Sequence, residues 1–226
     1  MKNPRLIQTK DGSNSLYIES LDETYHSTHG ARQESQHVYI KSGLEHLIAS
    51  GHEKEVRIFE MGFGTGLNAY LTNQFALDRD LKVYYESIEL FPITTEEHLS
   101  LGYHKLPELT KSVSDCQTII DTPWDSKVRV NSQFELKKVK GDFFNYELNQ
   151  PGFNLLFFDA FGHRAQSEMW EFKAFEKCAE ILQRGGILVT YASKGLARRN
   201  LVAAGFKVEK IEGAPGKREM MRATKL

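Results

Sequence analysis

The sequence predicts an α/β fold built on a doubly wound, mostly parallel sheet. Strand-like apolar runs alternate with helical patterns from about residue 56 to 205, and this alternation is typical of a parallel sheet with right-handed crossovers. The run at 153–161 is almost continuously apolar, as expected for a strand covered on both faces. The pattern after residue 205 predicts an antiparallel hairpin at one edge of the sheet.

Composition narrows the class of protein. The 226 residues are 40% hydrophobic and 26% charged, which suits one globular domain with an extension. A net charge of -1 gives no global attraction to nucleic acid or membrane, so such a partner needs a local patch. Cys116 and Cys178 form no CxxC pair, which favours a reducing compartment over a cysteine zinc site. With no apolar run near 18 residues, we expect a cytoplasmic protein without a membrane partner.

The N-terminal region is predicted to be a small extension packed on the core. The strand-like stretches LIQT and SLYIES flank the turn residues 11–14, which indicates a β-hairpin. Apolar residues between 38 and 48 then recur at helical spacing, so we expect a helix from the low thirties to about Ser50. Residues 1–50 form the predicted extension, and residues 51–226 form the main domain.

The main domain is predicted to begin with two strand–helix units. Their elements are a strand at 56–59 that ends in Glu60, a helix at 67–77, a strand at 81–90 that includes Glu89, and a helix opened by the capping box Thr94-x-x-Glu97. Residues 104–127 contain helical stretches that Pro107 and Pro123 interrupt.

The second half of the domain continues the alternation. Its expected elements are a hairpin at 128–142, a strand at 153–161, a helix at 168–182 closed by Gly185-Gly186, a strand at 187–192, a helix at 195–205 and a terminal hairpin at 206–224. This layout is typical of Rossmann-like class I methyltransferases, whereas a plain dinucleotide-binding domain lacks the closing hairpin.

The glycine turn GFGTG at 62–66 predicts a ligand site at the end of the first strand. A P-loop is excluded because Gly66 is followed by Leu67 and Asn68 rather than by Lys-Ser/Thr. A dinucleotide fingerprint needs a third glycine where Leu67 stands. The turn follows Glu60, which would repel a pyrophosphate but attract a cationic amino acid. We therefore predict S-adenosyl-L-methionine as the cofactor.

Acids at successive strand ends extend this prediction. Glu89 is placed to accept hydrogen bonds from ribose hydroxyls, and Gly141-Asp142 suits an adenine contact. The alternative for each acid is a solvated strand end. The predicted cofactor-binding residues of this region are Glu60, Gly62, Gly64, Thr65, Gly66, Asn68, Glu89, Gly141 and Asp142.

Asp159 follows six residues of the buried strand, at the sheet edge where doubly wound folds bind ligands. The alternative is an aspartate that caps the next helix. As a hypothesis, Asp159 binds the substrate amine, orients its lone pair and accepts or relays a proton. Phe161 could wall the substrate base or the transferred methyl, or it could be a core aromatic.

Four motifs together resemble the methyltransferase domain of the MnmC type: GFGTGLN, YHSTHGA, the DAF of FFDAFGHRAQSEMW, and GKREM. The resemblance runs over nearly the whole chain. It implies N-methylation of an aminomethyl group on the wobble uridine of certain bacterial tRNAs. It also implies that Tyr25 and Ser27 contact the cofactor from a lid or wall, which we favour over a metal site at His26 and His29.

The resemblance also carries expectations about partners. In two-domain relatives a flavin-dependent oxidase follows this domain, and because the chain stops at Leu226 it resembles the stand-alone form without a flavin domain. Upstream tRNA-modifying enzymes would then supply the substrate. Gly162-His163-Arg164 stands where relatives often carry prolines, so the shape of this loop is expected to differ.

The last 33 residues carry an excess of basic side chains, which could contact tRNA phosphates. The alternative is a solvated basic face. The predicted tRNA-binding residues are Lys194, Arg198, Arg199, Lys217 and Arg218.

Three rival functions compete at this level, and the basic C-terminal residues disfavour one of them, a small-molecule N-methyltransferase. An aminopropyltransferase of the spermidine-synthase type has a similar fold and an acid after the fourth strand, but the loop GHRAQ at 162–166 is basic where a polyamine needs acids. A non-catalytic tRNA-binding module is the remaining rival, and cofactor binding would discriminate against it.

Overall fold

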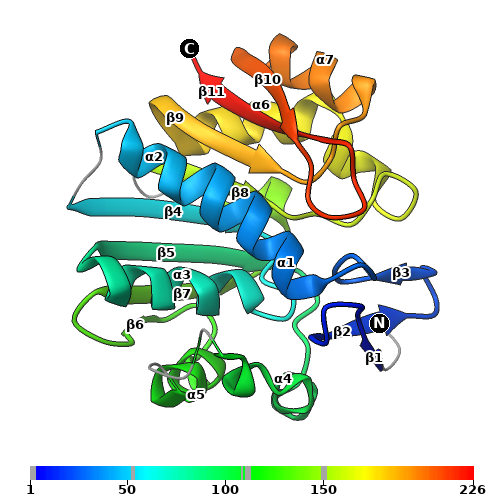
Figure 1. Cartoon of the computed structure of the whole chain (residues 1–226). Coiled ribbons are helices and arrows are strands. Elements are labelled where there is room, and N and C mark those ends of the chain that lie inside the picture. Colours follow the sequence, from blue (N-terminus) through cyan, green and yellow to red (C-terminus); the bar gives the residue numbers. More distant parts are fainter. Residues whose placement is uncertain (1–3, 52–53, 108, 110–112, 149–151) are drawn as a thin grey trace.

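A computed structural model describes residues 4–51, 54–107, 109, 113–148 and 152–226 of the chain. Its main sheet has eight strands in the order β10-β11-β9-β8-β4-β5-β7-β6, and a separate three-stranded sheet, β1-β2-β3, lies beside it (Figure 1). Strands β4, β5, β7, β8 and β9 run parallel to their neighbours in this series. The predicted doubly wound α/β class is confirmed.

The N-terminal hairpin forms as predicted. Strand β1 (Arg5–Gln8) pairs antiparallel with β2 (Asn14–Ile18). The turn between them is held by Asp11, whose carboxylate accepts hydrogen bonds from the backbone of Ser13 and the hydroxyl of Thr9. A third strand, β3 (Glu23–Thr24), pairs with β2. It was not predicted, because two residues are too short to show a period.

The predicted helix after the hairpin is one continuous rod that crosses a face of the main sheet (Figure 1). It consists of α1 (Ala31–Ser35), the π-helical segment η1 (Gln36–Glu45) and α2 (His46–Ala49). Gly43 lets the rod approach the sheet, since a Cβ there would lie 3.0 Å from the Val189 side chain and 3.3 Å from that of Phe157. The helix prediction is confirmed, but its π winding was not foreseen.

The strand–helix units of the main domain also lie close to their predicted positions. Their bounds are β4 (Glu55–Met61), α3 (Leu67–Arg79), β5 (Lys82–Glu89), α4 (Thr95–Leu101), η2 (Tyr103–Lys105), α5 (Val113–Asp121), β6 (Lys127–Arg129), β7 (Phe134–Lys140), η4 (Phe143–Asn145) and β8 (Phe153–Phe158). The capping box forms, because Thr94 Oγ accepts from the Glu97 amide and the Glu97 carboxylate accepts from the Thr94 amide.

One prediction for the C-terminal third of the chain is wrong. Its elements are η5 (Ser167–Trp170), α6 (Phe172–Ile181), β9 (Leu182–Thr190), α7 (Gly195–Ala203), β10 (Phe206–Glu212) and β11 (Glu219–Lys225). Gly185-Gly186 does not close α6, which ends at Ile181; both glycines lie inside β9. The register against β8 shifts there, and glycine in a strand often marks such a bulge. Trp170 lies in the 3₁₀ turn before α6.

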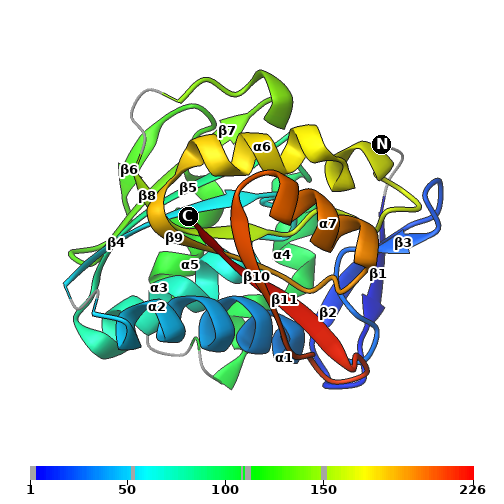
Figure 2. The same cartoon turned by 90° about the horizontal axis from the view of Figure 1, so that it is seen from above.

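Helices cover both faces of the sheet (Figure 2). The rod and α3 lie on one face, and α6 and α7 lie on the other. Successive residues of β8 alternate accordingly: Phe157 joins the core under the rod, and Phe158 joins the core under α6. In the described part of the chain, no helix has the length and apolar character needed to cross a bilayer.

Candidate active site

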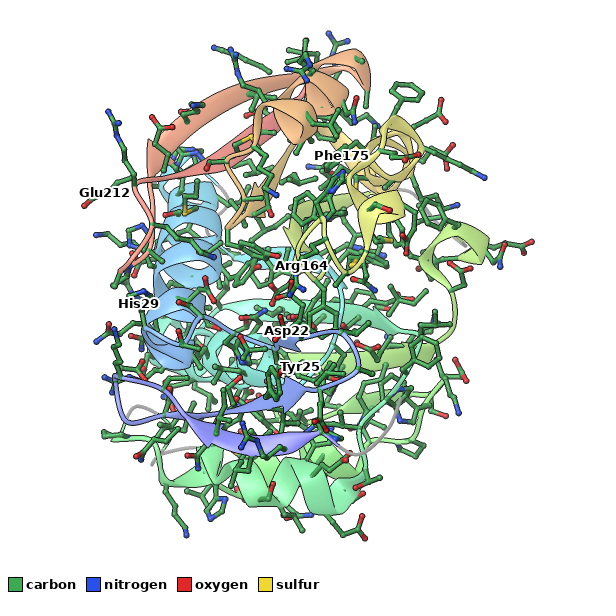
Figure 3. All side chains as sticks on the ribbon, turned by 90° about the vertical axis from the view of Figure 1, so that its right-hand side faces the viewer. Asp22, Tyr25, His29, Arg164, Phe175 and Glu212 are labelled. Atoms are coloured by element: carbon green, nitrogen blue, oxygen red, sulfur yellow. The ribbon has the colours of Figure 1, made fainter. Side chains whose placement is uncertain are left out.

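A cavity of about 450 Å³ lies at the carboxyl edge of β4, β5, β7 and β8, beneath the segment that leads from β3 to the rod. This volume is in the range of small-molecule sites. Figure 3 views this side of the molecule, with Tyr25 near its centre. Eleven of the predicted catalytic and cofactor-binding residues line the cavity: Tyr25, Ser27, Gly62, Gly64, Thr65, Asn68, Glu89, Gly141, Asp142, Asp159 and Phe161.

The glycine turn forms one wall of the cavity. The φ angles of Gly62, Gly64 and Gly66 are 91°, 50° and 75°, in the left-handed region that glycine tolerates best. A Cβ on Gly62 would lie only 2.9 Å from the Asp159 carbonyl oxygen, so the turn packs directly against the end of β8. Gly66 is the N-cap of α3 and does not line the cavity.

Two of the strand-end carboxylates are held by backbone amides. The Glu89 carboxylate accepts from the amides of Gly64 (3.1 Å) and Phe91 (2.9 Å). Burial raises the pKa of Glu89, and these amides act in the opposite direction. Asp142 accepts from the Phe144 amide at 2.9 Å. Both acids therefore have fixed positions on the cavity wall.

Glu60 lies beneath the cavity rather than in its wall, because it is fully buried within β4. Its carboxylate accepts hydrogen bonds from Asn68 Nδ2 (2.9 Å) and Ser87 Oγ (2.7 Å). Burial raises the pKa of Glu60 to about 8. Glu60 does not line the cavity, and its connection to it runs through Asn68.

Asp159 follows β8 and has both carboxylate oxygens fixed. Tyr39 donates to Oδ1 at 2.6 Å, and Asn68 donates to Oδ2 at 2.9 Å. Burial raises the pKa of Asp159 to about 7, while the hydrogen bond from Tyr39 opposes the rise. The alternative that Asp159 caps a helix is wrong, since Gln166 precedes η5 and Glu171 precedes α6. A half-buried carboxyl of this kind can exchange a proton near neutral pH.

Sequence reasoning missed several residues around Asp159. Tyr39 comes from the π-helical segment, a winding that is frequent at functional sites. Glu34 lines the cavity and pairs with Lys217 at 2.6 Å. The Lys217 Nζ also lies 3.9 Å from the centre of the Tyr191 ring. The helical spacing of residues 34–48 resembled an ordinary core face, so no pattern separated Glu34 and Tyr39 from it.

The loop after Asp159 is tied to the cavity at several points. Phe161 packs edge-to-face on Tyr25, with ring centres 5.1 Å apart. The indole of Trp170 donates to the Phe161 carbonyl at 2.8 Å. Arg164 reaches across to Asp22 (Figure 3), and it also pairs with Glu23. Ion pairs of Arg164 thus join the loop at 162–164 to the N-terminal sheet.

His26 has a structural role in the cavity wall. Its ring nitrogens lie 3.0 Å from Ser15 Oγ and 3.3 Å from Thr65 Oγ. Burial lowers the pKa of His26 to about 4, so the ring is neutral and positions Thr65. Among the described residues, no group of three or more potential metal ligands occurs.

The predicted basic residues separate into three groups. Lys217 lies inside the first cavity, paired with Glu34. Lys194 and Arg218 are exposed on the rim of a neighbouring cavity of about 490 Å³, which Lys217 also lines. Arg198 and Arg199 are exposed on α7 and line neither cavity.

A glycine turn, strand-end acids and a doubly wound sheet with a closing hairpin define a class I methyltransferase fold. The model of a family described as S-adenosyl-L-methionine-dependent methyltransferase matches residues 107–226. The chain belongs to this family, which confirms the predicted enzyme class and cofactor.

Individual relatives narrow the comparison. The chain is 32% identical to the tRNA 5-methylaminomethyl-2-thiouridine biosynthesis bifunctional protein MnmC of Cupriavidus metallidurans, over 95% of this chain and 33% of that protein. It is 27% identical to the MnmC of Aliivibrio fischeri, over 90% of this chain and 32% of that protein. The chain thus spans about a third of the length of these relatives.

A solved structure shows the same fold. The crystal structure of MNMC2 from Aquifex aeolicus superposes with a TM-score of 0.81 at 24% identity, and the match covers 99% of this chain and 70% of that chain. The likeness extends over the N-terminal sheet and the rod as well as the main sheet, since almost the whole chain is covered.

Proposed function

We propose that this chain transfers a methyl group from S-adenosyl-L-methionine to the aminomethyl nitrogen on the wobble uridine of tRNA. The product would be 5-methylaminomethyl-(2-thio)uridine. The observation that carries the proposal is the match of 90–95% of this chain to proteins named for the biosynthesis of that nucleoside. The substrate would come from upstream tRNA-modifying enzymes, and the activity would be cytoplasmic. Residues 1–50 would serve as an extension that closes the site.

The first cavity fits the cofactor in charge and shape. Six acids line it, with Lys217 as the one lysine among the described lining residues, so the cavity favours a cation. The turn requires glycine, since a Cβ on Gly62 would lie 2.9 Å from the Asp159 carbonyl oxygen and one on Gly64 would lie 3.0 Å from the Tyr25 ring. When bound, S-adenosyl-L-methionine supplies an electrophilic methyl group on a positively charged sulfur.

Specific contacts follow from the position of each residue. We assign the turn residues Gly62, Gly64 and Thr65 to the amino-acid end of the cofactor. Glu89 is suited to the ribose and Gly141-Asp142 to the base. Other residues are assigned to support the cofactor site. Tyr25 and Ser27 lie in the segment between β3 and α1 that covers the cavity, Gly66 lies at the start of α3, and Asn68 links the cavity to Glu60 beneath it.

Asp159 is assigned to the substrate amine. The amine must be uncharged to attack, and a neighbouring carboxylate normally favours its charged form. A carboxyl whose burial raises its pKa to about 7 is a better proton acceptor for an amine than an ordinary aspartate, because proton transfer is most efficient when the two pKa values are close. Tyr39 and Asn68 keep this carboxylate in one orientation. Phe161 lies on the same loop and could wall the reacting groups.

The test is a methyl-transfer assay with nucleoside analysis. The protein is incubated with methyl-labelled S-adenosyl-L-methionine and tRNA from a strain that lacks this activity, and the digested tRNA is separated into nucleosides. We expect the label in a 5-methylaminomethyl uridine. Label in a different nucleoside, or none in tRNA while the cofactor binds, would refute the proposal.

A further inference from the structure

We propose that the second cavity binds the pyrimidine ring of the nucleotide to be methylated, with its flanking phosphates at Lys194 and Arg218. This inference rests on the proposed function and adds to it a separate subsite for the base. The first cavity would then hold the cofactor and only the reactive arm of the substrate.

The two cavities are neighbours with a shared wall. The second cavity has a volume of about 490 Å³, and Gly162, Tyr191 and Lys217 line both cavities. Asp159 lines only the first. A ring in the second cavity can therefore direct a substituent past Tyr191 and Lys217 towards Asp159, while the ring itself stays clear of the cofactor.

The interior of the second cavity suits an unstacked base. Trp170, Tyr191, Leu196 and Ala197 line it; Trp170 and Ala197 are buried, so Tyr191 and Leu196 supply the accessible surface. Leu196 is 39% exposed, so an apolar surface is available for contact. Proteins that recognise single-stranded RNA commonly stack splayed-out bases on such side chains.

The aromatic wall is fixed relative to Asp159. The Trp170 indole donates to the Phe161 carbonyl, and the Tyr191 hydroxyl donates to the Ala160 carbonyl, each at 2.8 Å. Both acceptors lie within two residues of Asp159. A base packed against this wall would therefore keep a constant distance from the carboxylate, as near-attack alignment requires.

The rim of the second cavity carries two exposed cations, Lys194 and Arg218, beside one carboxylate, Glu219. Lys194 and Arg218 are exposed, and neither has an ion pair with another described residue. Nearby Lys210 and Arg222, by contrast, pair with Glu219 and Glu209. Unpaired cations beside an apolar pocket match a nucleotide, which presents phosphates next to a flat ring.

The test compares two substitutions on the same helix. Leu196→Glu places a carboxylate at the second cavity, and Val202→Glu places one on α7 away from it; Val202 is 53% exposed and does not line the cavity. The probe is an anticodon stem-loop RNA, and its Kd is measured by fluorescence anisotropy. Cofactor Kd is measured by calorimetry with S-adenosyl-L-methionine alone.

We expect Leu196→Glu to weaken RNA binding by at least about tenfold, the loss of roughly one stacked base, and Val202→Glu to weaken it by about twofold or less. Cofactor affinity should stay unchanged in both. Equal weakening by the two variants would show a general charge effect and overturn the subsite, and so would no weakening by either. Failure of the unsubstituted protein to bind and methylate RNA would instead refute the proposed function.

A second pair of variants removes charge from the comparison. Leu196→Trp fills the cavity and Val202→Trp adds the same side chain elsewhere on the helix, with folding checked by thermal melting. Weaker RNA binding only in Leu196→Trp supports the subsite, whereas RNA binding equal in the two Trp variants contradicts it.

Discussion

The two cavities on either side of Tyr191 differ in the sign of their charge. The first is lined by six acids, including Glu34, Glu89 and Asp159, and its lysine is already paired. The second has Lys194 and Arg218 on its rim. A cationic cofactor and an anionic polymer would thus be drawn to different parts of one sheet edge. The near-zero net charge of the chain conceals this separation.

The cavities also differ in how tightly their polar groups are held. Asp159 and Glu89 are partly buried, hydrogen-bonded and shifted in pKa. Lys194 and Arg218 are exposed. Substitutions in the first cavity should therefore change chemistry or cofactor binding, and substitutions at the second should change RNA affinity in a salt-dependent way.

The largest effect is expected for Asp159→Asn. The amide keeps an acceptor for Tyr39 but cannot take a proton, so kcat should fall by about 10²–10⁴. Cofactor Kd, measured by calorimetry, should change little. Glu168→Gln is the control, since Glu168 lines the same cavity but is exposed. A loss of cofactor affinity as large as the loss of kcat would show that Asp159 acts in cofactor binding.

Gly62→Ala should act on cofactor binding. The new Cβ would lie 2.9 Å from the Asp159 carbonyl at a φ of 91°, and such strain costs of order 1–3 kcal/mol. We expect cofactor Kd to rise by about tenfold or more if that strain displaces the turn. Gly205→Ala is the control, because its φ of 90° strains an alanine equally, a Cβ there meets no atom within 4 Å, and Gly205 does not line the cavity. An equal rise in cofactor Kd for the two substitutions would show that the turn has no special role in cofactor binding.

Tyr39→Phe should shift the pH dependence of the reaction. The hydrogen bond from Tyr39 lowers the pKa of Asp159, so its loss should raise that pKa further. The carboxylate is the proposed active form, so the rising acidic limb of kcat/KM should move to higher pH by about 1–2 units, from a charged hydrogen bond of roughly 1.5–3 kcal/mol. An unchanged profile with reduced activity would indicate a structural role only.

The smallest effects are expected on the basic rim. Lys194→Ala and Arg218→Ala should each flatten the dependence of log affinity for single-stranded RNA on log salt by about 0.7. Lys207→Ala is the control, because Lys207 is exposed and lines neither cavity. Binding titrations at several salt concentrations give the slopes. An equally large change of slope in the control would show that any lost positive charge has this effect, wherever it lies on the protein.

Much of the site's outline could be predicted from the sequence, because parallel strands end at one edge of the sheet. The turn at 62–66 and the acids Glu89, Asp142 and Asp159 come from four different strands, yet the topology alone brings them to one cavity. The closing hairpin was also predictable, because turn residues at 213–218 lie between two strand-like runs.

The features of the site that could not be predicted depend on side-chain direction and helix winding. Glu60 lies within β4, which pairs with β5 on one side and β8 on the other. Side chains alternate between the two faces of a strand, and this alternation directs the Glu60 side chain beneath the turn, where it is buried. Tyr39 reaches Asp159 from a π-helical segment whose winding no simple period reveals. Lys217 was predicted to meet RNA because it lies in a basic run, but its pairing with Glu34 joins residues 183 positions apart.

The central claim is that the acidic cavity holds the cofactor with its sulfur facing Asp159. A crystal structure with S-adenosylhomocysteine tests this most directly. We expect the ribose against Glu89, the base beside Asp142 and the sulfur directed towards the Asp159 carboxylate. Density for the ligand in the second cavity, or anywhere else outside the first, would contradict the claim.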